Sequence, residues 1–323
     1  MAFSHQTGKQ ISKPEIAAII SSIVEKYKGR CHKGTVFHIY NCKDDKVFDK
    51  WTTTFPLLVV KGQLYALERI LGSGAYGKVY GGRNVLTRDK VAIKRQAYHS
   101  NPDPMVQKQV WVTAGHGIGL YNPDIVPEAE YLPGGDVYFV LPLAQTNFMK
   151  WASQMFREHP CNGWKKVLAA YIKIAEDLEK LHNDHLVHMD LKQDNVLIID
   201  DIAFLSDFGK VERVGKMLPL IKAFQQQYPH NAPEYFVDPL TLVQPQVNNG
   251  AWPLVLVKIE FYTVKTSFDS WSFGFMLNKS LKYFPQQVQI SLRMIIDKTM
   301  NITPHMRLKM ADVKKELKLI ELN

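Results

Sequence analysis

The stretch from His188 to Asn195 reads HMDLKQDN, and VLI follows it directly at 196–198. Further along the chain stand DFG at 207–209 and APE at 232–234. Each of these motifs is short enough to arise by chance, so its meaning depends on which other motifs the chain carries and in what order. The whole set, rather than any one motif, therefore decides the fold.

Upstream, Gly72, Gly74 and Gly77 form a GxGxxG pattern. Dinucleotide-binding folds use the same spacing, but there the pattern leads from a strand into a helix. Here KVYGGRNV follows at 78–85, which favours a strand over a helix. The pattern therefore indicates either a hairpin whose glycines let backbone N–H groups approach phosphates, or an ordinary glycine-rich hairpin.

Lys94 lies in the apolar stretch VAIK at 91–94. A lysine in such a strand is costly to bury unless it meets an anion. Taken together and in this order, the glycine pattern, Lys94, HMDLKQDN, DFG and APE resemble the eukaryotic-type protein kinase family. The resemblance extends from about Leu71 to Arg307, which is most of the chain.

The resemblance implies an α+β, bilobal fold with a β-rich N-lobe and a helical C-lobe. The sequence pattern points the same way, because residues 65–93 and 136–143 form strand-like runs. Residues 164–182 instead carry an apolar stripe at helical spacing.

The expected domains follow from the limits of the motifs. We expect an N-terminal extension at 1–60, with a helix over 13–26 and strand-like runs at 35–40 and 53–60. The kinase domain is expected at 61–323, divided into an N-lobe at 61–143 and a C-lobe at 144–323.

Phosphoryl transfer requires the protein to position the reactants and to balance the charge on the phosphates. The resemblance implies that Asp190 orients the acceptor hydroxyl and takes its proton, and that Lys192 lies near the transferred group. Lys192 also favours Ser/Thr over Tyr as the acceptor. Lys94 is expected to pair with the α- and β-phosphates of ATP, and Asn195 and Asp207 to hold Mg²⁺ through oxygen ligands.

The same resemblance implies a nucleotide pocket in which the glycine loop covers the phosphates and apolar side chains enclose the adenine. Pro142 at the first hinge position lacks an N–H, so we expect its carbonyl to accept from the adenine amino group and Ala144 to donate. Plain core packing remains an equal explanation for each apolar residue. The cofactor-binding residues expected are Leu71, Gly72, Gly74, Gly77, Val79, Ala92, Lys94, Leu141, Ala144 and Leu197.

Several other residues have supporting roles in the family. Asp269 is expected to brace the catalytic loop from the start of a C-lobe helix, and Arg307 to form a buried pair with Glu234. His188 and Phe208 are expected to pack in an apolar column and not to act as catalysts.

The sequence departs from the family where a helix normally supplies a glutamate to the strand lysine. That helix should fall within 104–115, which contains no glutamate. Gln107 and Gln109 are the nearest candidates, and Glu128 or Glu130 are acids that could replace it. A weakened ion pair is the ground for an alternative function, an ATP-binding pseudokinase or scaffold module.

Met189 stands where the family commonly has an arginine that binds a phosphate on the activation segment. That segment, residues 210–231, contains no Ser or Thr, and Tyr228 is its only hydroxyl. The two absences agree, so we expect activity without Ser/Thr phosphorylation there. The insertion at 237–268 makes the following stretch longer than usual, and its LVLVKIEFYTV at 254–264 alternates like one strand of a hairpin.

We therefore expect a Ser/Thr protein kinase that transfers the γ-phosphoryl group of MgATP to protein hydroxyls. Its expected cofactors are ATP and Mg²⁺, and its expected partner is a protein substrate. The pseudokinase or scaffold remains the alternative. Small-molecule kinases share a loop resembling HxDLxxxN, but they do not normally carry APE with its distant arginine, so they rank last.

The composition fits this class of protein. With 323 residues, 46% hydrophobic and 22% charged, the chain can bury a large core, which excludes disordered and collagen-like proteins. The net charge of +9 attracts anions, but no basic run concentrates it, so no nucleic acid partner is required. No early apolar stretch approaches the roughly twenty residues of a membrane span.

The cysteines and the first residues bear on the compartment. Cys31, Cys42 and Cys161 form no CxxC pair, and the start of the chain has no apolar signal region. The cysteines favour a reducing compartment, and the start of the chain argues against a cleaved secretory signal. We expect a cytoplasmic protein, or one in a host cytoplasm if its source is a pathogen.

Overall fold

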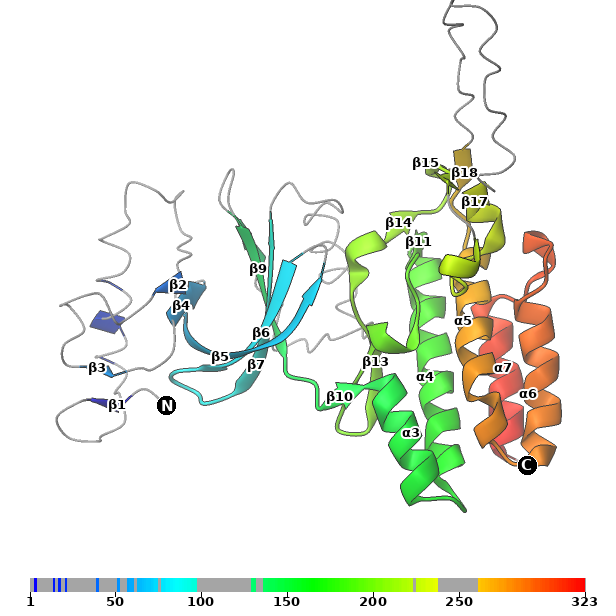
Figure 1. Ribbon diagram of the computed structural model, residues 1–323, viewed down its shortest axis with the longest axis horizontal. Coiled ribbons are helices and arrows are strands. Elements are labelled where there is room, and N and C mark those ends of the chain that lie inside the picture. The colour runs from blue at the N-terminus through cyan, green and yellow to red at the C-terminus, as the bar shows by residue number, and fades with distance from the viewer. Residues whose placement is uncertain are drawn as a thin grey trace, which may run out of the picture. The chain divides into compact units, whose positions relative to one another are not determined.

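Figure 1 shows the computed structural model of the chain. It describes residues 63–74, 77–97, 136–222, 225–237 and 261–322, together with short pieces at 3–4, 14, 17–18, 21, 39–40, 51–52, 57–60 and 129–131. The chain divides into two compact units, the first made of residues 1–116 and 120–144, the second of residues 117–119 and 145–323. Each unit has an apolar core of its own.

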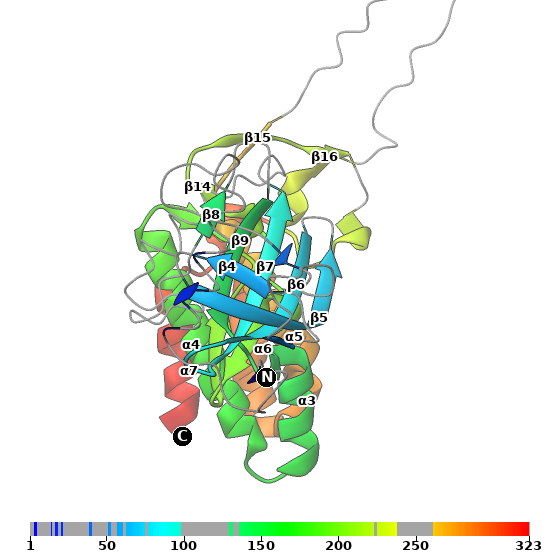
Figure 2. The ribbon, with the colours of Figure 1, turned by 90° about the vertical axis from the view of Figure 1, so that its left-hand side faces the viewer.

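An antiparallel sheet organises the first unit, and its described strands follow the order β2-β4-β5-β6-β7-β9-β8. Figure 2 shows β4 to β7 and β9 next to one another. The strands are β2 (Ile39–Tyr40), β4 (Leu57–Val60), β5 (Gln63–Gly74), β6 (Gly77–Asn84), β7 (Lys90–Ala97), β8 (Ala129–Tyr131) and β9 (Asp136–Pro142). A separate antiparallel pair joins β1 (Phe3–Ser4) to β3 (Trp51–Thr52).

The two faces of this sheet differ because successive side chains of a strand point to opposite sides. One face carries the apolar core of the unit, where Leu58 and Ile93 are fully buried. The register places Ile93 opposite Tyr80 on β6 and Val140 on β9, and both of these side chains pack in the same core. The alternate residues of β6, β7 and β9 therefore belong to the opposite face.

Helices form most of the second unit. The long helix α4 (Gly163–Asn183) contains the apolar stripe predicted for 164–182, and the stripe is buried at Val167, Leu168, Tyr171, Ile174, Ala175, Leu178 and Leu181. Before it, α3 (Phe148–Glu158) begins after Asn147, whose side chain accepts from the N–H of Lys150 and satisfies a free donor of the first turn. The later helices are α5 (Ser267–Ser280), α6 (Gln286–Thr299) and α7 (Met310–Leu322).

The helices of the second unit pack as a bundle, with α4 against α7 and α5 against α6, and Figure 1 shows these four side by side. The fully buried Tyr171 on α4 links two of them. Its hydroxyl donates to the carbonyl of Met276 on α5 at 2.9 Å and lies 2.8 Å from the hydroxyl of Ser280. A buried polar contact of this kind fixes how α4 is turned against α5.

Short strands and 3₁₀ turns complete the second unit. β10 (Thr146–Asn147), β12 (Val196–Ile199) and β13 (Ile202–Leu205) form one small sheet, and three pairs are β11 (Leu186–Val187) with β14 (Glu212–Arg213), β15 (Met217–Pro219) with β18 (Phe261–Thr263), and β16 (Ile221–Lys222) with β17 (Phe236–Val237). The turns are η3 (Gln193–Asn195), η4 (Phe208–Lys210), η5 (Gln225–Gln227), η6 (Pro233–Tyr235), η8 (Leu281–Tyr283) and η9 (Pro304–Met306).

Two aspartates form the connection between β12 and β13. Asp200 and Asp201 both have positive φ, which a two-residue type I′ turn requires and which glycine or asparagine usually supplies. Side chains hold the turn in place. Gln145 accepts from the N–H of Asp200 at 2.8 Å, and Trp151 donates to the carboxylate of Asp201 at 3.1 Å.

These elements confirm the predicted α+β class, with strands in the first part of the chain and helices in the second. Of the predicted N-terminal extension, positions 14, 17–18 and 21 are helical, whereas 39–40 and 57–60 are strands. Because β4 pairs with β5, the sheet runs across residue 60. The domain boundaries remain a prediction.

Within the part of the chain that the structure describes, no helix combines the length and the apolar character needed to cross a bilayer. Cys161 is a free, exposed thiol. Cys31 and Cys42 lie outside the described residues.

Candidate active site

The carboxylate of Asp190 is the centre of the site in the second unit. Two donors come from its own loop, because Lys192 Nζ and Asn195 Nδ2 each lie 3.1 Å from Oδ2. Asn195 Nδ2 also donates to the main-chain carbonyl of Asp190 at 2.8 Å. The structure thus brings together three residues that the motif HMDLKQDN predicted.

Two further donors reach the other oxygen of Asp190 from downstream segments. Lys210 Nζ lies 3.1 Å and His230 Nε2 3.3 Å from Oδ1. Burial alone would raise the pKa of Asp190, but the contacts with His230, Lys210 and Lys192 hold that pKa well below its usual range. The carboxylate is therefore ionised at neutral pH. Sequence reasoning missed Lys210 and His230, since nothing in their spacing links them to Asp190.

Asp269 holds the main chain of this loop, as the sequence predicted. Its buried carboxylate, in the first turn of α5, accepts from the N–H of His188 at 2.8 Å and from the N–H of Met189 at 3.1 Å. Met189 has a φ of 64°, which is unusual for a residue with a side chain. The buried acid thus stabilises a sharp turn directly before Asp190.

Asn195 and Asp207, the expected Mg²⁺ ligands, are connected through Ser206. The N–H and the hydroxyl of Ser206 both donate to the main-chain carbonyl of Asn195, at 2.8 and 2.9 Å. Because the amide nitrogen of Asn195 donates to Asp190, its amide oxygen is the atom left to bind a cation.

One amide oxygen and one carboxylate suit Mg²⁺, which takes few protein ligands and completes its shell with water and phosphate oxygens. The donor set therefore fits this ion. Among the described residues, no group of three or more His, Cys, Asp or Glu side chains is arranged to hold a metal by itself.

His188 and Phe208 pack as predicted. Both side chains are fully buried, and their ring centres lie 5.5 Å apart. His188 Nε2 lies 3.0 Å from the carbonyl of Ser206, so this nitrogen donates to the main chain. These contacts give His188 a structural role.

The predicted pair of Glu234 and Arg307 is present and bidentate, with N···O distances of 2.8 and 2.9 Å. The guanidinium of Arg307 is fully buried and also donates to the carbonyls of Ser267 at 3.0 Å and Asn301 at 2.7 Å. It lies over the ring of Trp271 at 5.1 Å. The buried cation is thus paired with a carboxylate, and each of its three nitrogens donates a hydrogen bond. A buried charge needs such partners if it is not to destabilise the fold.

In the first unit, predicted nucleotide-binding residues share the sheet face opposite the apolar core. The register pairs Val79 with Lys94 and Ala92 with Leu141, and directly paired residues lie on one face. Ala92 and Lys94 are two residues apart on β7, so both pairs belong to the same face. Four residues from three strands therefore form one surface.

The glycine pattern lies on two paired strands, as predicted, with Gly72 opposite Val79 and Gly74 opposite Gly77. The predicted turn at 75–76 lies outside the described residues. A Cβ added at Gly72 would meet no atom within 4 Å, so this position leaves open space beside the strand. Gly77 has a φ of 147°, a conformation that favours glycine. At Gly72 the hairpin thus offers backbone groups without an obstructing side chain.

The other expected pocket residues are distributed over both units. Leu71 is exposed on β5, Ala144 is half-buried at the end of the first unit, and Leu197 is half-buried on β12 of the second. Their contacts with a nucleotide remain predictions.

The helix expected at 104–115 and the acids that could replace its missing glutamate lie largely outside the described residues. This applies to 104–115, including Gln107 and Gln109, and to Glu128. Glu130 lies on β8, where only the main chain is described. That Glu128 or Glu130 replaces the missing glutamate therefore stays a prediction.

Met189 lies in an apolar cluster that sequence reasoning did not identify. Leu218 and Leu220 of the activation segment contribute to it, as do Tyr262 and Val264 at the end of the insertion. The full cluster consists of Val187, Met189, Ala232, Tyr262, Val264 and Phe268, with Leu218, Leu220, Tyr235 and Trp271 packed against them. We call this set the apolar clasp.

Main-chain pairing strengthens the clasp, because Leu218 on β15 lies directly opposite Tyr262 on β18. The strand predicted within 254–264 is therefore present at 261–263. Its described partner is β15 of the activation segment, and the rest of the predicted hairpin lies outside the described residues.

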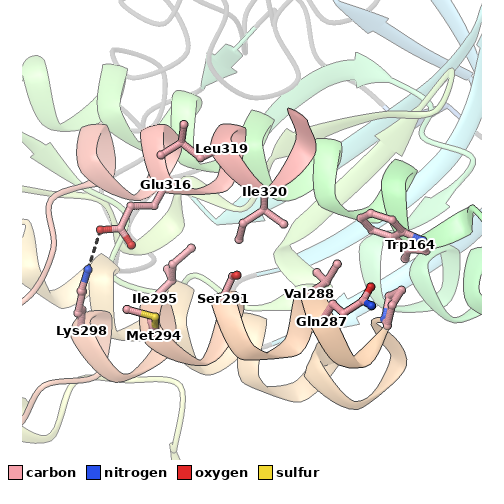
Figure 3. A pocket seen from close by; sticks show the side chains of 11 residues that line it. Trp164, Gln287, Val288, Ser291, Met294, Ile295, Lys298, Glu316, Leu319 and Ile320 are labelled. Atoms are coloured by element: carbon pink, nitrogen blue, oxygen red, sulfur yellow. Dashed lines mark hydrogen bonds and ion pairs between the residues drawn. The ribbon is translucent and has the colours of Figure 1, made fainter. Parts of the chain in front are cut away.

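A separate groove of about 610 Å³ lies between α6 and α7. Figure 3 shows Leu319 and Ile320 of α7 on one side and Val288 of α6 on the other, with the ion pair of Lys298 and Glu316 at one end. None of the residues predicted for the active site lines this groove.

Comparison with known proteins shows that the protein kinase domain matches residues 65–318. The chain is 30% identical over 147 residues to the serine/threonine-protein kinase PknH of Mycobacterium tuberculosis, which covers 45% of this chain and 23% of that protein. It is 25% identical over 212 residues to the receptor-like cytosolic serine/threonine-protein kinase RBK1 of Arabidopsis thaliana. That match covers 64% of this chain and 44% of RBK1.

The human mitogen-activated protein kinase kinase kinase 5 is 30% identical over 178 residues, covering 51% of this chain and 12% of that protein. The chain thus spans less than half the length of each of these relatives. The domain match covers most of the chain and contains every motif from Gly72 to Arg307. The chain belongs to the protein kinase family.

Proposed function

We propose that this protein is a Ser/Thr protein kinase that transfers the γ-phosphoryl group of MgATP to hydroxyl groups of a protein substrate in the cytoplasm. The observation that supports it best is the ionised Asp190, held by Lys192 and Asn195, with Asp207 joined to Asn195 through Ser206. Two of the three named relatives are serine/threonine-protein kinases, which favours the same acceptor.

In the proposed reaction the acceptor hydroxyl approaches the carboxylate of Asp190, which orients it and takes its proton. The hydroxyl oxygen bonds to the γ-phosphorus while the bond from that phosphorus to the bridging oxygen breaks, and ADP leaves with this electron pair. Lys192 balances charge on the transferred group. Because such transition states are loose, position and charge supply most of the rate gain.

The residues present fit ATP and Mg²⁺. The amide oxygen of Asn195 and the carboxylate of Asp207 would hold the ion, and Lys94 would pair with the α- and β-phosphates next to the glycine hairpin. When bound, the ion neutralises negative charge that builds up on the phosphates. The open position at Gly72 supports close approach of a phosphate to the main chain.

We further propose that activity requires no Ser/Thr phosphorylation of the activation segment. In many kinases an arginine before the catalytic aspartate binds the phosphate. Here Met189 occupies that position and packs in the apolar clasp with Leu218 and Tyr262. Hydrophobic burial and β15–β18 pairing would thus order the segment without a charged group.

The test is transfer of labelled phosphate from ATP to a mixed protein substrate with Mg²⁺. Asp190→Asn and Lys94→Ala should each lower transfer at least about a hundredfold, since general base and phosphate contacts contribute on this scale. Asp194→Asn is the matched control, because this acid lies in the same loop but is exposed and bonds Asn147. Equal transfer by wild type and Asp190→Asn would end the proposal.

One observation favours a second function. Residues 104–115 contain no glutamate, where a helix of the family normally supplies one, and this departure from the family supports a pseudokinase or scaffold. Nucleotide binding without transfer to protein, measured on the same wild-type preparation, would identify that function. Label on a small metabolite alone would indicate a small-molecule kinase.

A further inference from the structure

The two donors on Oδ1 of Asp190 differ in how firmly they are held. Lys210 has a side chain 40% exposed and a long flexible stem, so keeping it in one place costs much side-chain entropy. His230 has a side chain only 18% exposed and two rotatable bonds. Of the two, His230 is the better fixed partner of the carboxylate.

The main chain around His230 is anchored to α5. Ser272 donates its hydroxyl to the carbonyl of His230 at 2.6 Å, and Trp271 donates its ring N–H to the carbonyl of Pro229 at 3.2 Å. The same helix carries Asp269, which holds the N–H groups of His188 and Met189. One helix therefore fixes both sides of the contact between His230 and Asp190.

We propose that His230 is a positioning residue for the phosphoryl transfer reaction, which orients the Asp190 carboxylate by donating a hydrogen bond from Nε2 to Oδ1. This proposal rests on the proposed kinase function. Because an ionised carboxylate can only accept, Nε2 must carry the proton. The imidazole thus holds Oδ1, while Lys192 and Asn195 hold Oδ2.

The number of donors around the Asp190 carboxylate indicates that Lys210 has a different role from His230. A carboxylate has about four lone-pair sites, and Lys192, Asn195, Lys210 and His230 use all of them. An acceptor hydroxyl needs one of these sites. The acceptor hydroxyl displaces Lys210, which is the more exposed donor. His230, whose main chain is bonded to α5, stays in place and holds the orientation of the carboxylate.

The kinetic test uses His230→Phe, which keeps a ring but removes the donor. We expect kcat to fall by about tenfold to a hundredfold with KM for ATP unchanged, since small losses of alignment have effects of this size. His230→Gln places an N–H at a similar reach and should recover most of kcat. Ser272→Ala keeps the imidazole but frees its main chain, and should lower kcat by a smaller factor.

Lys210→Met should change kcat less than His230→Phe does. His305→Gln is the matched control, because His305 is an exposed histidine on η9 of the same unit. Thermal denaturation of each variant checks that the fold is kept. If His230→Phe misfolds, the comparison of His230→Gln with Ser272→Ala still tests the role of a fixed donor.

A second measurement does not depend on activity. The NMR signal of the His230 ring, identified by its loss in His230→Gln, should move when Asp190→Asn removes the charge it faces, whereas the His305 signal should not. An unmoved His230 signal overturns the inference. So does wild-type kcat in His230→Phe when Asp190→Asn is inactive. Full activity of Asp190→Asn would instead overturn the proposed kinase function.

Discussion

Asp177 is an acid on the buried side of α4. Its side chain is fully buried, Lys173 Nζ lies 2.5 Å from Oδ1, and Oδ2 has no hydrogen-bond partner among the described residues. Burial raises the pKa of Asp177 to about 6, although Lys173 and Lys180 act to lower it. The folded protein therefore favours the protonated form of this carboxyl group more than the unfolded chain does.

Stability should depend on pH through Asp177. A pKa raised from 3.8 to about 6 means that this group stabilises the fold below pH about 4 and loses that contribution as pH rises through 6. At neutral pH the cost is roughly 3 kcal/mol. Asp177→Asn cannot ionise, so the unfolding free energy of the variant relative to wild type should increase between pH 4 and pH 7.

Urea denaturation at several pH values measures this difference. Asp184→Asn is the control, because Asp184 ends the same helix and is exposed. If Asp177→Asn and wild type keep a constant difference across this range, the raised pKa is wrong.

At this scale the sequence predicted which residues meet but not all of their neighbours. Asp190, Lys192 and Asn195 lie within one short motif, so local turn geometry is enough to bring them together. Lys210 and His230 reach Asp190 only through the path of the intervening chain, which no spacing rule predicts. The nucleotide contacts of the expected pocket residues remain untested predictions.

At the scale of elements, the pairing of β15 with β18 connects the activation segment to the insertion. Alternation within 254–264 was enough to predict a strand, because a period of two marks one buried face. It could not identify the partner, since any strand edge can pair with many others. The apolar clasp escaped prediction for the same reason, as its members come from separate segments.

The clasp should be needed for activity. Leu218→Asp places a charge in the apolar clasp, opposite Tyr262, which costs roughly 2 kcal/mol or more and should disorder the segment. We expect kinase activity to fall more than about tenfold, the ratio that 1.4 kcal/mol represents. Hydrogen exchange should rise in residues 210–222 at the same time.

The neighbouring residue supplies the control for this experiment. Met217→Asp alters the same strand, but Met217 is 61% exposed and lies outside the clasp, so activity should change little. Equal loss in the two variants would show that strand β15 is sensitive to any charge. Unchanged activity in Leu218→Asp would contradict the role of the clasp.

At the scale of the whole molecule, Arg307 joins parts of the chain that are far apart in sequence. It bonds Glu234 after the activation segment, Ser267 at the start of α5 and Asn301 after α6. The sequence predicted the pair with Glu234 from the motif alone. The two carbonyl contacts were not predictable, because every residue carries a carbonyl and only the fold selects two of them.

Removing this arginine should destabilise the second unit. Arg307→Met leaves Glu234 and two carbonyls without their donor, and the loss of one partner of a buried pair costs about 3–5 kcal/mol. Arg293→Met is the control, since Arg293 makes one exposed bond to Asn278 and its loss should cost less than about 0.5 kcal/mol. Equal urea midpoints for the two variants would show that the contacts of Arg307 add little to the stability of the protein.

The apolar clasp also bears on how the activity of this molecule is governed. A phosphate on an activation segment is added and removed by other enzymes, so those enzymes can switch the activity on and off. Side chains such as Met189, Tyr262 and Val264 are fixed when the protein is made, and no phosphatase can erase them. If the clasp orders the activation segment as proposed, the output of this kinase would be set by its synthesis, its degradation and its access to substrate.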